Sequence, residues 1–227
     1  MASPLARALE EVRHRIAAAC VRSLRDPLSV ELVAVSKNVP VERVRELVAL
    51  SHGLFGENRV QEALGKIQEV GSGARWHLVG HLQRNKVRHA VGAFELIQSV
   101  DDLDLARDIG RRAGARGITQ KILVQVNLSR EETKSGADEA DLMSLLTAIR
   151  DIEHLDLRGL MMIPPPAKSA PESRPWFARL RALRHEAETR LSLHLPDLSM
   201  GMTDDFEVAV EEGATIVRVG RAIFGER

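Results

Sequence analysis

Short runs of mainly apolar residues alternate with longer amphipathic stretches along almost the whole chain. The short runs are typical of buried strands, and apolar residues that recur every three or four positions indicate helices with one buried face. A regular alternation of the two is typical of parallel α/β folds. The expected helices include 41–50, 60–70, 103–113 and 142–149, and the expected strands are 31–35, 53–56, 76–79, 94–98, 121–126, 157–162, 198–200 and 215–219.

Eight strand–helix units predict an α/β fold, a single domain over residues 1–227 in which the strands close into a parallel (β/α)8 TIM barrel. An open doubly wound sheet uses much of the same pattern, but eight units favour closure. The segment 164–175, rich in Pro, Ser and Ala, follows the sixth strand and is expected at the end of the barrel that carries active sites. It is either a stiff surface connection, which is the simpler interpretation, or a lid over a ligand.

The first 27 residues predict an extra helix that packs on the barrel. Ser3 followed by Pro4 is a favourable N-cap and first helical position. Charged residues interrupt the apolar stretch that a signal peptide requires, and no apolar run in the chain is long enough for a membrane span. The apolar positions of this helix are Leu5, Leu9, Val12, Ile16, Cys20 and Leu24.

The composition and charge of the chain argue against some classes of binding partner. The 227 residues are 44% hydrophobic, enough for a sizeable core, and 32 basic residues balance 32 acidic ones. The basic residues are scattered, which argues against nucleic acid or an anionic membrane as the partner. Cys20 is the only cysteine, so an intramolecular disulfide and thiolate zinc sites are excluded and a cytoplasmic location is expected.

Lys37 is the strongest candidate for chemistry. The chain has six lysines against 26 arginines, and Lys37 comes directly after the apolar run of the first strand. An amine at the carboxyl end of that strand points into the barrel mouth, where partial loss of hydration favours the neutral form that makes Schiff bases. The alternative is a lysine that extends into solvent. Lys134, in the loop after the fifth strand, is a second and weaker candidate.

The loops after the seventh and eighth strands predict a phosphate site. Barrels commonly bind phosphate there, through backbone N–H groups and the start of a short helix. Gly201 and Gly220 would let the backbone approach an anion, and Ser199 adds a hydroxyl donor. Asp204 and Asp205 would weaken such a site if they faced it, and we expect them to point away.

In a closed barrel the first strand lies beside the eighth, so Lys37 and the phosphate site are neighbours. A ligand that bridges them needs a carbonyl group at one end and a phosphate at the other. Pyridoxal 5′-phosphate (PLP) meets this description, and so do phosphorylated sugars that carry a carbonyl.

Six motifs, in order along nearly the whole chain, resemble the pyridoxal phosphate homeostasis protein family, which is similar to the barrel domain of alanine racemase, a fold-type III PLP-binding fold. Two positions depart from the family pattern: Thr203 stands where a serine is frequent, and Arg59 where some members carry an aromatic residue. The motifs are AVSK at 34–37, FGENRVQE at 55–62, WHLVGHLQRNK at 76–86, GLM at 159–161, SMGM at 199–202 and RVGRAIFG at 218–225.

The resemblance implies that Lys37 holds PLP as a Schiff base and that Arg218 faces the pyridine nitrogen. A fixed positive charge there keeps the nitrogen unprotonated, which makes the ring a weaker electron sink than one paired with a carboxylate. The alternative for Arg218 is an ordinary ion pair at the end of a strand.

The resemblance also implies the remaining contacts to the cofactor. Ser199 and the backbone donors around Gly220 and Arg221 would hold the phosphate. Asn58 and His77, at the mouths of the second and third strands, would line the ring pocket. The alternatives are a helix N-cap for Asn58 and a hydrogen-bonded core histidine for His77.

Two functions of different classes stay open at this point. One is a carrier that binds, buffers and delivers PLP without turnover, with amino acids and PLP-dependent apo-enzymes as further partners. The other is an amino-acid racemase, which needs proton-transfer groups on both faces of the substrate. Alanine racemases take one of these, a tyrosine, from a second β-rich domain, whereas this chain has no tyrosine and ends just after the eighth strand. This difference favours a carrier, with a monomer as the default, over the racemase and over an enzyme acting on a sugar phosphate.

Overall fold

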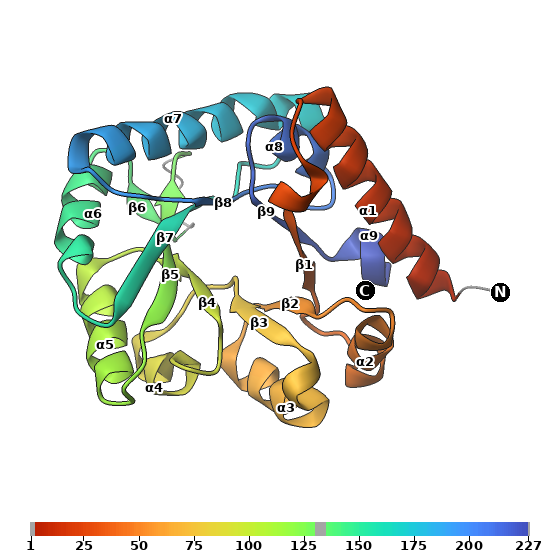
Figure 1. The fold of residues 1–227 in the computed structure, drawn as a ribbon, viewed down its shortest axis with the longest axis horizontal. Coiled ribbons are helices and arrows are strands. Elements are labelled where there is room, and N and C mark those ends of the chain that lie inside the picture. The colour runs from red at the N-terminus through yellow and green to blue at the C-terminus, as the bar shows by residue number, and fades with distance from the viewer. Residues whose placement is uncertain (1–2, 130–134, 227) are drawn as a thin grey trace.

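The computed structural model describes residues 3–129 and 135–226, and within these residues eight parallel strands close into a barrel. Each barrel strand pairs with its neighbour in chain order, and β9 returns to β1 (Figure 1). The two-residue β6 (Ala137–Asp138) pairs with the end of β5. The barrel strands are β1 Glu31–Val35, β2 Leu54–Glu57, β3 Arg75–Leu78, β4 Leu96–Val100, β5 Gln120–Asn127, β7 Leu155–Met161, β8 Asp197–Ser199 and β9 Ile216–Val219.

The predicted (β/α)8 barrel is therefore confirmed, and the expected strand boundaries agree with the observed ones to within two residues. Helices surround the barrel (Figure 1), and none of those in the described residues is long and apolar enough to cross a membrane. The helices are α1 Pro4–Arg22, α2 Val41–Ala49, α3 Val60–Val70, α4 Val87–Ala90, α5 Leu103–Gly114, α6 Leu142–Arg150, α7 Arg174–Leu191, α8 Phe206–Glu211 and α9 Arg221–Phe224.

The N-terminal helix α1 is present as the sequence predicts, it packs against α8 and α9, and it is shorter than expected. Ser3 is the N-cap, and its hydroxyl accepts a hydrogen bond from the Ala6 amide at 3.1 Å. The helix ends at Arg22, and Leu24 is 97% exposed in a left-handed backbone conformation with φ of 56°. The last apolar position of the predicted pattern, Leu24, therefore lies two residues beyond the end of the helix.

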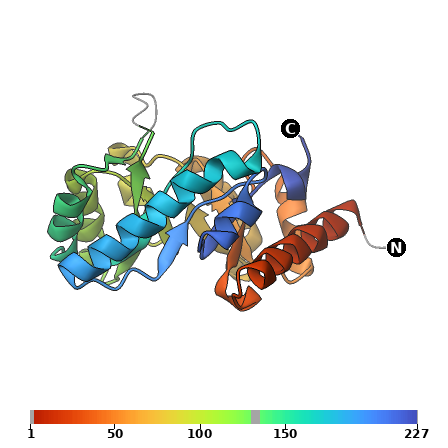
Figure 2. The ribbon, with the colours of Figure 1, turned by 90° about the horizontal axis from the view of Figure 1, so that it is seen from above.

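The proline-rich segment after β7 lies on the same side of the molecule as the C-terminal end of the chain (Figure 2). Its expected end is wrong by two residues, since Pro175 already stands in the first turn of α7, a position that proline favours. The preceding 3-10 turn spans Ala170–Ser173. The stiff surface connection, which the sequence favours, and the alternative of a lid over a ligand both stay predictions.

Alternate residues of each strand point into the barrel and form a stack of layers. The layer nearer the amino ends of the strands is apolar. Further along the same strands, the inward positions become polar, with Gln98, Ser199 and Arg218 all buried. The polar layer thus lies above an apolar floor made by Val33, Leu54, Leu96, Leu123, Met161 and Ile216.

Gly159 allows β7 to approach β8 at the point where these two strands pair. A Cβ atom on Gly159 would lie 1.8 Å from the carbonyl oxygen of Asp197. We therefore expect Gly159→Ala to lower the free energy of unfolding by more than about 4 kcal/mol, or to prevent folding, in urea titrations. As a control, Gly65→Ala in α3 meets no atom within 4 Å and should stabilise the protein by about 0.5–1 kcal/mol. A Gly159→Ala protein as stable as the wild type would contradict this assignment.

Candidate functional site

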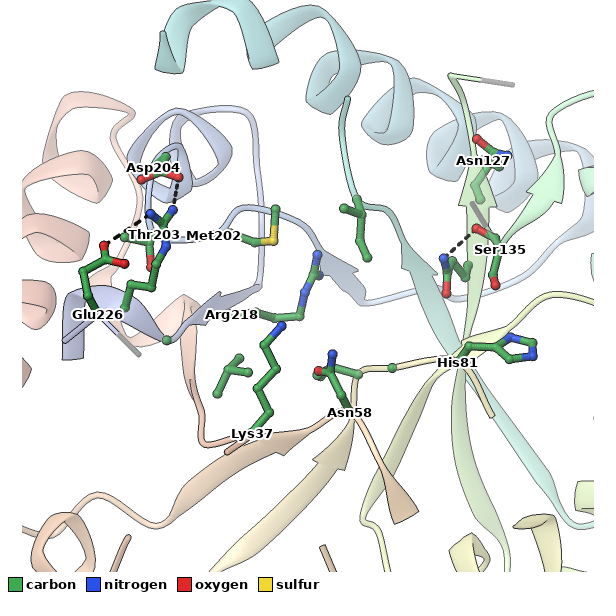
Figure 3. A pocket seen from close by; sticks show the side chains of 18 residues that line it. Lys37, Asn58, His81, Asn127, Ser135, Met202, Thr203, Asp204, Arg218 and Glu226 are labelled. Atoms are coloured by element: carbon green, nitrogen blue, oxygen red, sulfur yellow. Dashed lines mark hydrogen bonds and ion pairs between the residues drawn. The ribbon is translucent and has the colours of Figure 1, made fainter. Parts of the chain in front are cut away.

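A pocket of about 620 Å³ opens at the carboxyl ends of the strands, a volume in the range of small-molecule sites. Its lining combines side chains from the ends of β1, β2, β3, β5 and β9 with the loop that follows β8 (Figure 3). Five of the eight site residues expected from the sequence line it: Lys37, Asn58, Arg218, Gly220 and Arg221.

Lys37 reaches this pocket because it continues the inward alternation of β1. Val33 lies in the apolar floor and Val35 lines the pocket, so the next inward position is Lys37. The Lys37 side chain is half-buried and makes no ion pair or hydrogen bond with any other described residue. Its amine is therefore available for a ligand (Figure 3). Lys134, the second candidate, lies outside the described residues.

Arg218 is a buried cation without an ion-pair partner among residues 3–129 and 135–226. Its guanidinium donates to the Ser199 hydroxyl at 2.6 Å and to the Met162 carbonyl at 2.7 Å. Burial lowers the pKa of Arg218 to about 10, only partly offset by the charge of Asp205, so the side chain stays protonated at neutral pH. The expected alternative, an ion pair at the end of the strand, is not seen among these residues. The remaining donors of Arg218 are available to the pocket that it lines.

Ser199 and His77 lie in the barrel interior beneath the pocket. The Ser199 hydroxyl donates to Gln98 Oε1 at 2.6 Å, and the Gln98 amide nitrogen lies 2.9 Å from Nδ1 of His77. Because the Gln98 oxygen already accepts from Ser199, its NH2 group is the donor to His77. His77 then carries its own proton on Nε2. This chain of hydrogen bonds fixes the orientation of the Arg218 guanidinium from below.

His77 lines a different cavity, at the amino ends of the strands, together with Arg75 and Glu95. Gly201 does not line the mouth pocket either. A Cβ atom on Gly201 would lie 2.5 Å from the Cβ of Ala209, so a glycine is required for the loop to pack on α8. Direct contacts of Ser199, Gly201 and His77 with a ligand stay predictions.

Asn58 lines the pocket and does not cap a helix, since the N-cap position of α3 is Arg59. Gly80 fixes its place. A Cβ atom on Gly80 would lie 2.4 Å from the Asn58 carbonyl oxygen, so only glycine allows the loop after β3 to pack this closely against Asn58.

The loop after β8 and the start of α9 form the polar end of the pocket. Thr203, Gly220 and Arg221 line it, and the Thr203 hydroxyl lies 3.4 Å from the amide nitrogen of Ala222. The Arg221 side chain forms an ion pair with Asp204 across the rim (Figure 3). Asp204 therefore faces the pocket, contrary to the expectation that it points away. The Asp204 carboxylate opposes an anion here, but its ion pair with Arg221 offsets that charge, and the hydroxyl and backbone N–H groups suit an anion such as a phosphate.

Sequence reasoning did not identify Gln98 and Thr203. Gln98 was detectable as one of two polar residues in β4, with Ser99, because a buried amide needs hydrogen-bond partners. Thr203 stood out only as a departure from a frequent serine, although a hydroxyl in the loop after β8 is a natural donor to an anion.

Two buried histidines give the fold a predictable response to acid. Burial lowers the pKa of both His52 and His77 to about 4, from an ordinary value of 6.5. Between about pH 6.5 and pH 4 these histidines are protonated in the unfolded chain but neutral in the folded chain. The free energy of unfolding therefore falls through this window by about 3 kcal/mol per histidine. In urea titrations at pH 7.5 and 4.5, we expect His77→Gln to lose roughly half as much of this stability as the wild type. An equal loss in both proteins would contradict this prediction.

The whole barrel is similar to proteins of known family. Residues 8–227 match the family described as alanine racemase, N-terminal domain. Pyridoxal phosphate homeostasis proteins of Aquifex aeolicus and Pseudomonas aeruginosa are 43% and 42% identical, over 96% and 99% of this chain and 96% of each relative. The solved structure of PipY from Synechococcus elongatus, with PLP bound, is 42% identical and superposes with a TM-score of 0.84 over 94% of this chain and 100% of its own. The matched range contains all pocket residues named above.

Proposed function

Because the chain belongs to the pyridoxal phosphate homeostasis protein family, we propose that it binds PLP in the mouth pocket and keeps the cofactor available to other proteins without turning it over. The observation that carries this proposal is one pocket that holds both an amine free of ion pairs to the described residues, on Lys37, and the donors of Thr203, Gly220 and Arg221. The PLP bound to PipY, a barrel of the same fold, supports the same conclusion.

The residues of the pocket fit the cofactor group by group. When bound, PLP supplies an aldehyde, to which a primary amine adds with loss of water and formation of a C=N bond. Lys37 presents that amine, and Thr203 with the backbone of Gly220 and Arg221 would bind the phosphate. Arg218 would donate to the pyridine nitrogen and, as a fixed cation, keep it unprotonated. Asn58 would lie beside the ring.

Ser199, Gln98 and His77 act through Arg218 in this proposal. Their hydrogen bonds hold the guanidinium from the barrel interior, so its free donors face the ring edge of a bound cofactor. Gly201 acts through the loop that carries Thr203, since its carbonyl accepts from the Arg218 amide at 3.0 Å.

A carrier suits this pocket better than a racemase does. Racemisation needs a second proton-transfer group opposite Lys37, and the chain has no tyrosine to supply one. Among described residues His81 lines the pocket, but its side chain is 52% exposed and lies 3.7 Å from the Asp101 carboxylate. We propose that amino acids and PLP-dependent apo-enzymes are further partners, and that the protein is a cytoplasmic monomer.

One experiment tests both parts of the proposal. The purified protein is incubated with PLP, reduced with borohydride and digested, and the modified peptide is identified by mass spectrometry. We expect one adduct, on Lys37. A second sample, loaded with PLP but not reduced, is incubated with single enantiomers of several amino acids in heavy water, and we expect their α-hydrogens to be retained. The absence of any adduct would refute PLP binding through Lys37, and rapid exchange with loss of optical purity would refute the carrier.

A further inference from the structure

A buried ionic cluster formed by Glu57, Glu62 and Lys66 lies beside the turn that carries Lys37, outside the pocket. The Lys66 ammonium contacts Glu57 Oε1 at 2.8 Å and Glu62 Oε1 at 2.7 Å. Its side chain is only 9% exposed, and that of Glu57 is fully buried. Taking the charges of Glu57 and Lys66 out of water is costly unless they are paired and hydrogen-bonded, so the cluster invites a functional explanation.

The cluster binds the residues on both sides of Lys37. Lys66 Nζ donates to the Ser36 carbonyl at 2.6 Å, and the Asn38 amide donates to Glu62 Oε1 at 2.5 Å. The Ser36 hydroxyl adds a bond to Glu57 Oε1 at 2.6 Å. The peptide groups before and after Lys37 are thus each held by a charged side chain.

These hydrogen bonds hold the tight turn that contains Lys37. The Ser36 carbonyl accepts from the Val39 amide at 3.0 Å, which makes Lys37 and Asn38 the central residues of a tight turn. Asn38 has φ of 57°, a left-handed conformation that asparagine adopts more readily than most residues other than glycine. The carboxylate of Glu62, on α3, accepts a hydrogen bond from the Asn38 amide and so holds this turn in place.

From this arrangement we infer that Glu62 and Lys66 are positioning residues, which fix the backbone dihedrals of Lys37 and so aim its amine into the pocket. Each residue has two soft backbone dihedrals between rigid peptide planes. Lys66 holds the plane before Lys37, and Glu62 holds the plane after it, so neither dihedral is free. The inference rests on the proposed function of Lys37 and adds the residues that make its amine competent.

The charges of the cluster agree with this role. Burial opposes ionisation of Glu62, but the hydrogen bonds from Lys66 and from the Asn38 amide outweigh it and lower the pKa of Glu62 below its ordinary value. Glu62 is therefore a carboxylate at neutral pH and accepts strongly from Asn38. Burial raises the pKa of Glu57, although hydrogen bonds from Lys66 and Ser36 oppose the rise.

The test uses Glu62. Its side chain is 24% exposed, so replacing it should destabilise the fold less than replacing Glu57 or Lys66. Glu62→Met removes the acceptor of the Asn38 amide, whereas Glu62→Gln keeps an acceptor oxygen and serves as the conservative variant. Glu69→Met, on the same helix but in an exposed ion pair with Arg45, controls for the loss of a charge from α3. Two ligands are compared: PLP, and 4′-deoxypyridoxine 5′-phosphate, which has a methyl group in place of the aldehyde.

We expect the rate of borohydride-trapped labelling of Lys37 by PLP to fall roughly 10- to 100-fold in Glu62→Met. Glu62→Gln should recover most of that rate, and Glu69→Met should match the wild type. Affinity for the deoxy analogue should be the same in all four proteins, because only the amine is misplaced. The inference would be overturned if Glu62→Met were labelled as fast as the wild type, or if its affinity for the deoxy analogue fell as much as its labelling rate. Either result would leave the proposed function intact. A wild type that is never labelled at Lys37 would overturn both.

Discussion

A Lys37→Ala protein will form no borohydride-stable adduct with PLP, and the absorption band of the C=N linkage will be lost completely. The reason is chemical, since alanine has no nitrogen to add to the aldehyde. Among the described residues that line the pocket, Lys37 is the only lysine. The measurement is peptide mapping of the reduced protein, together with the absorption spectrum before reduction.

The matched control for Lys37 is Lys168→Ala, which removes an exposed amine from the segment between β7 and α7. It should be labelled like the wild type. Lys37→Ala should still bind 4′-deoxypyridoxine 5′-phosphate, because Arg218 and the donors of the phosphate end are untouched. An undiminished adduct in Lys37→Ala, mapped to another lysine such as Lys134, would show that the anchor is misassigned.

The barrel and the place of Lys37 at the pocket could be predicted from the sequence because both follow from simple periodicities. Residues at alternate positions of a strand face the same side, so Val33, Val35 and Lys37 form one inward row. The same rule applied to β9 brings Ile216 and Arg218 inward. Chain order then places β1 beside β9, so the amine and the guanidinium reach one pocket.

Side-chain partners could not be predicted in the same way. Ser199 stands at the end of β8, where a hydroxyl can turn to the mouth or to the interior, and the choice depends on Gln98, which is 101 positions away in the chain. The acceptor that fixes Asn38 is on another element, and only the packing of α3 on β2 brings Glu62 to it. His77 shows the same limit, because strand register decides whether it lies near the mouth or near the amino ends.

The charge of Arg218, in the polar layer under the pocket, would affect the ring of a bound cofactor. Arg218 is charged and buried, yet no carboxylate of the described residues pairs with it, so the barrel bears a desolvation cost that neutral hydrogen bonds offset only in part. A bound pyridine nitrogen would accept from the free donors of this guanidinium. In the proposed function this contact would favour an unprotonated ring, a weaker electron sink than a ring paired with a carboxylate.

Arg218→Met is expected to weaken PLP binding by roughly 10- to 100-fold, the range for loss of a hydrogen bond from a charged donor. It should also lower the free energy of unfolding by about 1–3 kcal/mol, because the Met162 carbonyl and the Ser199 hydroxyl lose a buried partner. The measurements are direct titration with PLP and urea unfolding of the free protein.

The specific control for Arg218 is a ligand rather than a second site. In deazapyridoxal 5′-phosphate, carbon replaces the ring nitrogen, so the wild type should bind it more weakly than PLP, and Arg218→Met should bind the two ligands alike. This difference between ligands isolates the contact with the nitrogen from any general loss of stability, which affects both ligands equally. If Arg218→Met weakened binding of the deaza analogue as much as binding of PLP, the guanidinium would act on the fold and not on the ring nitrogen.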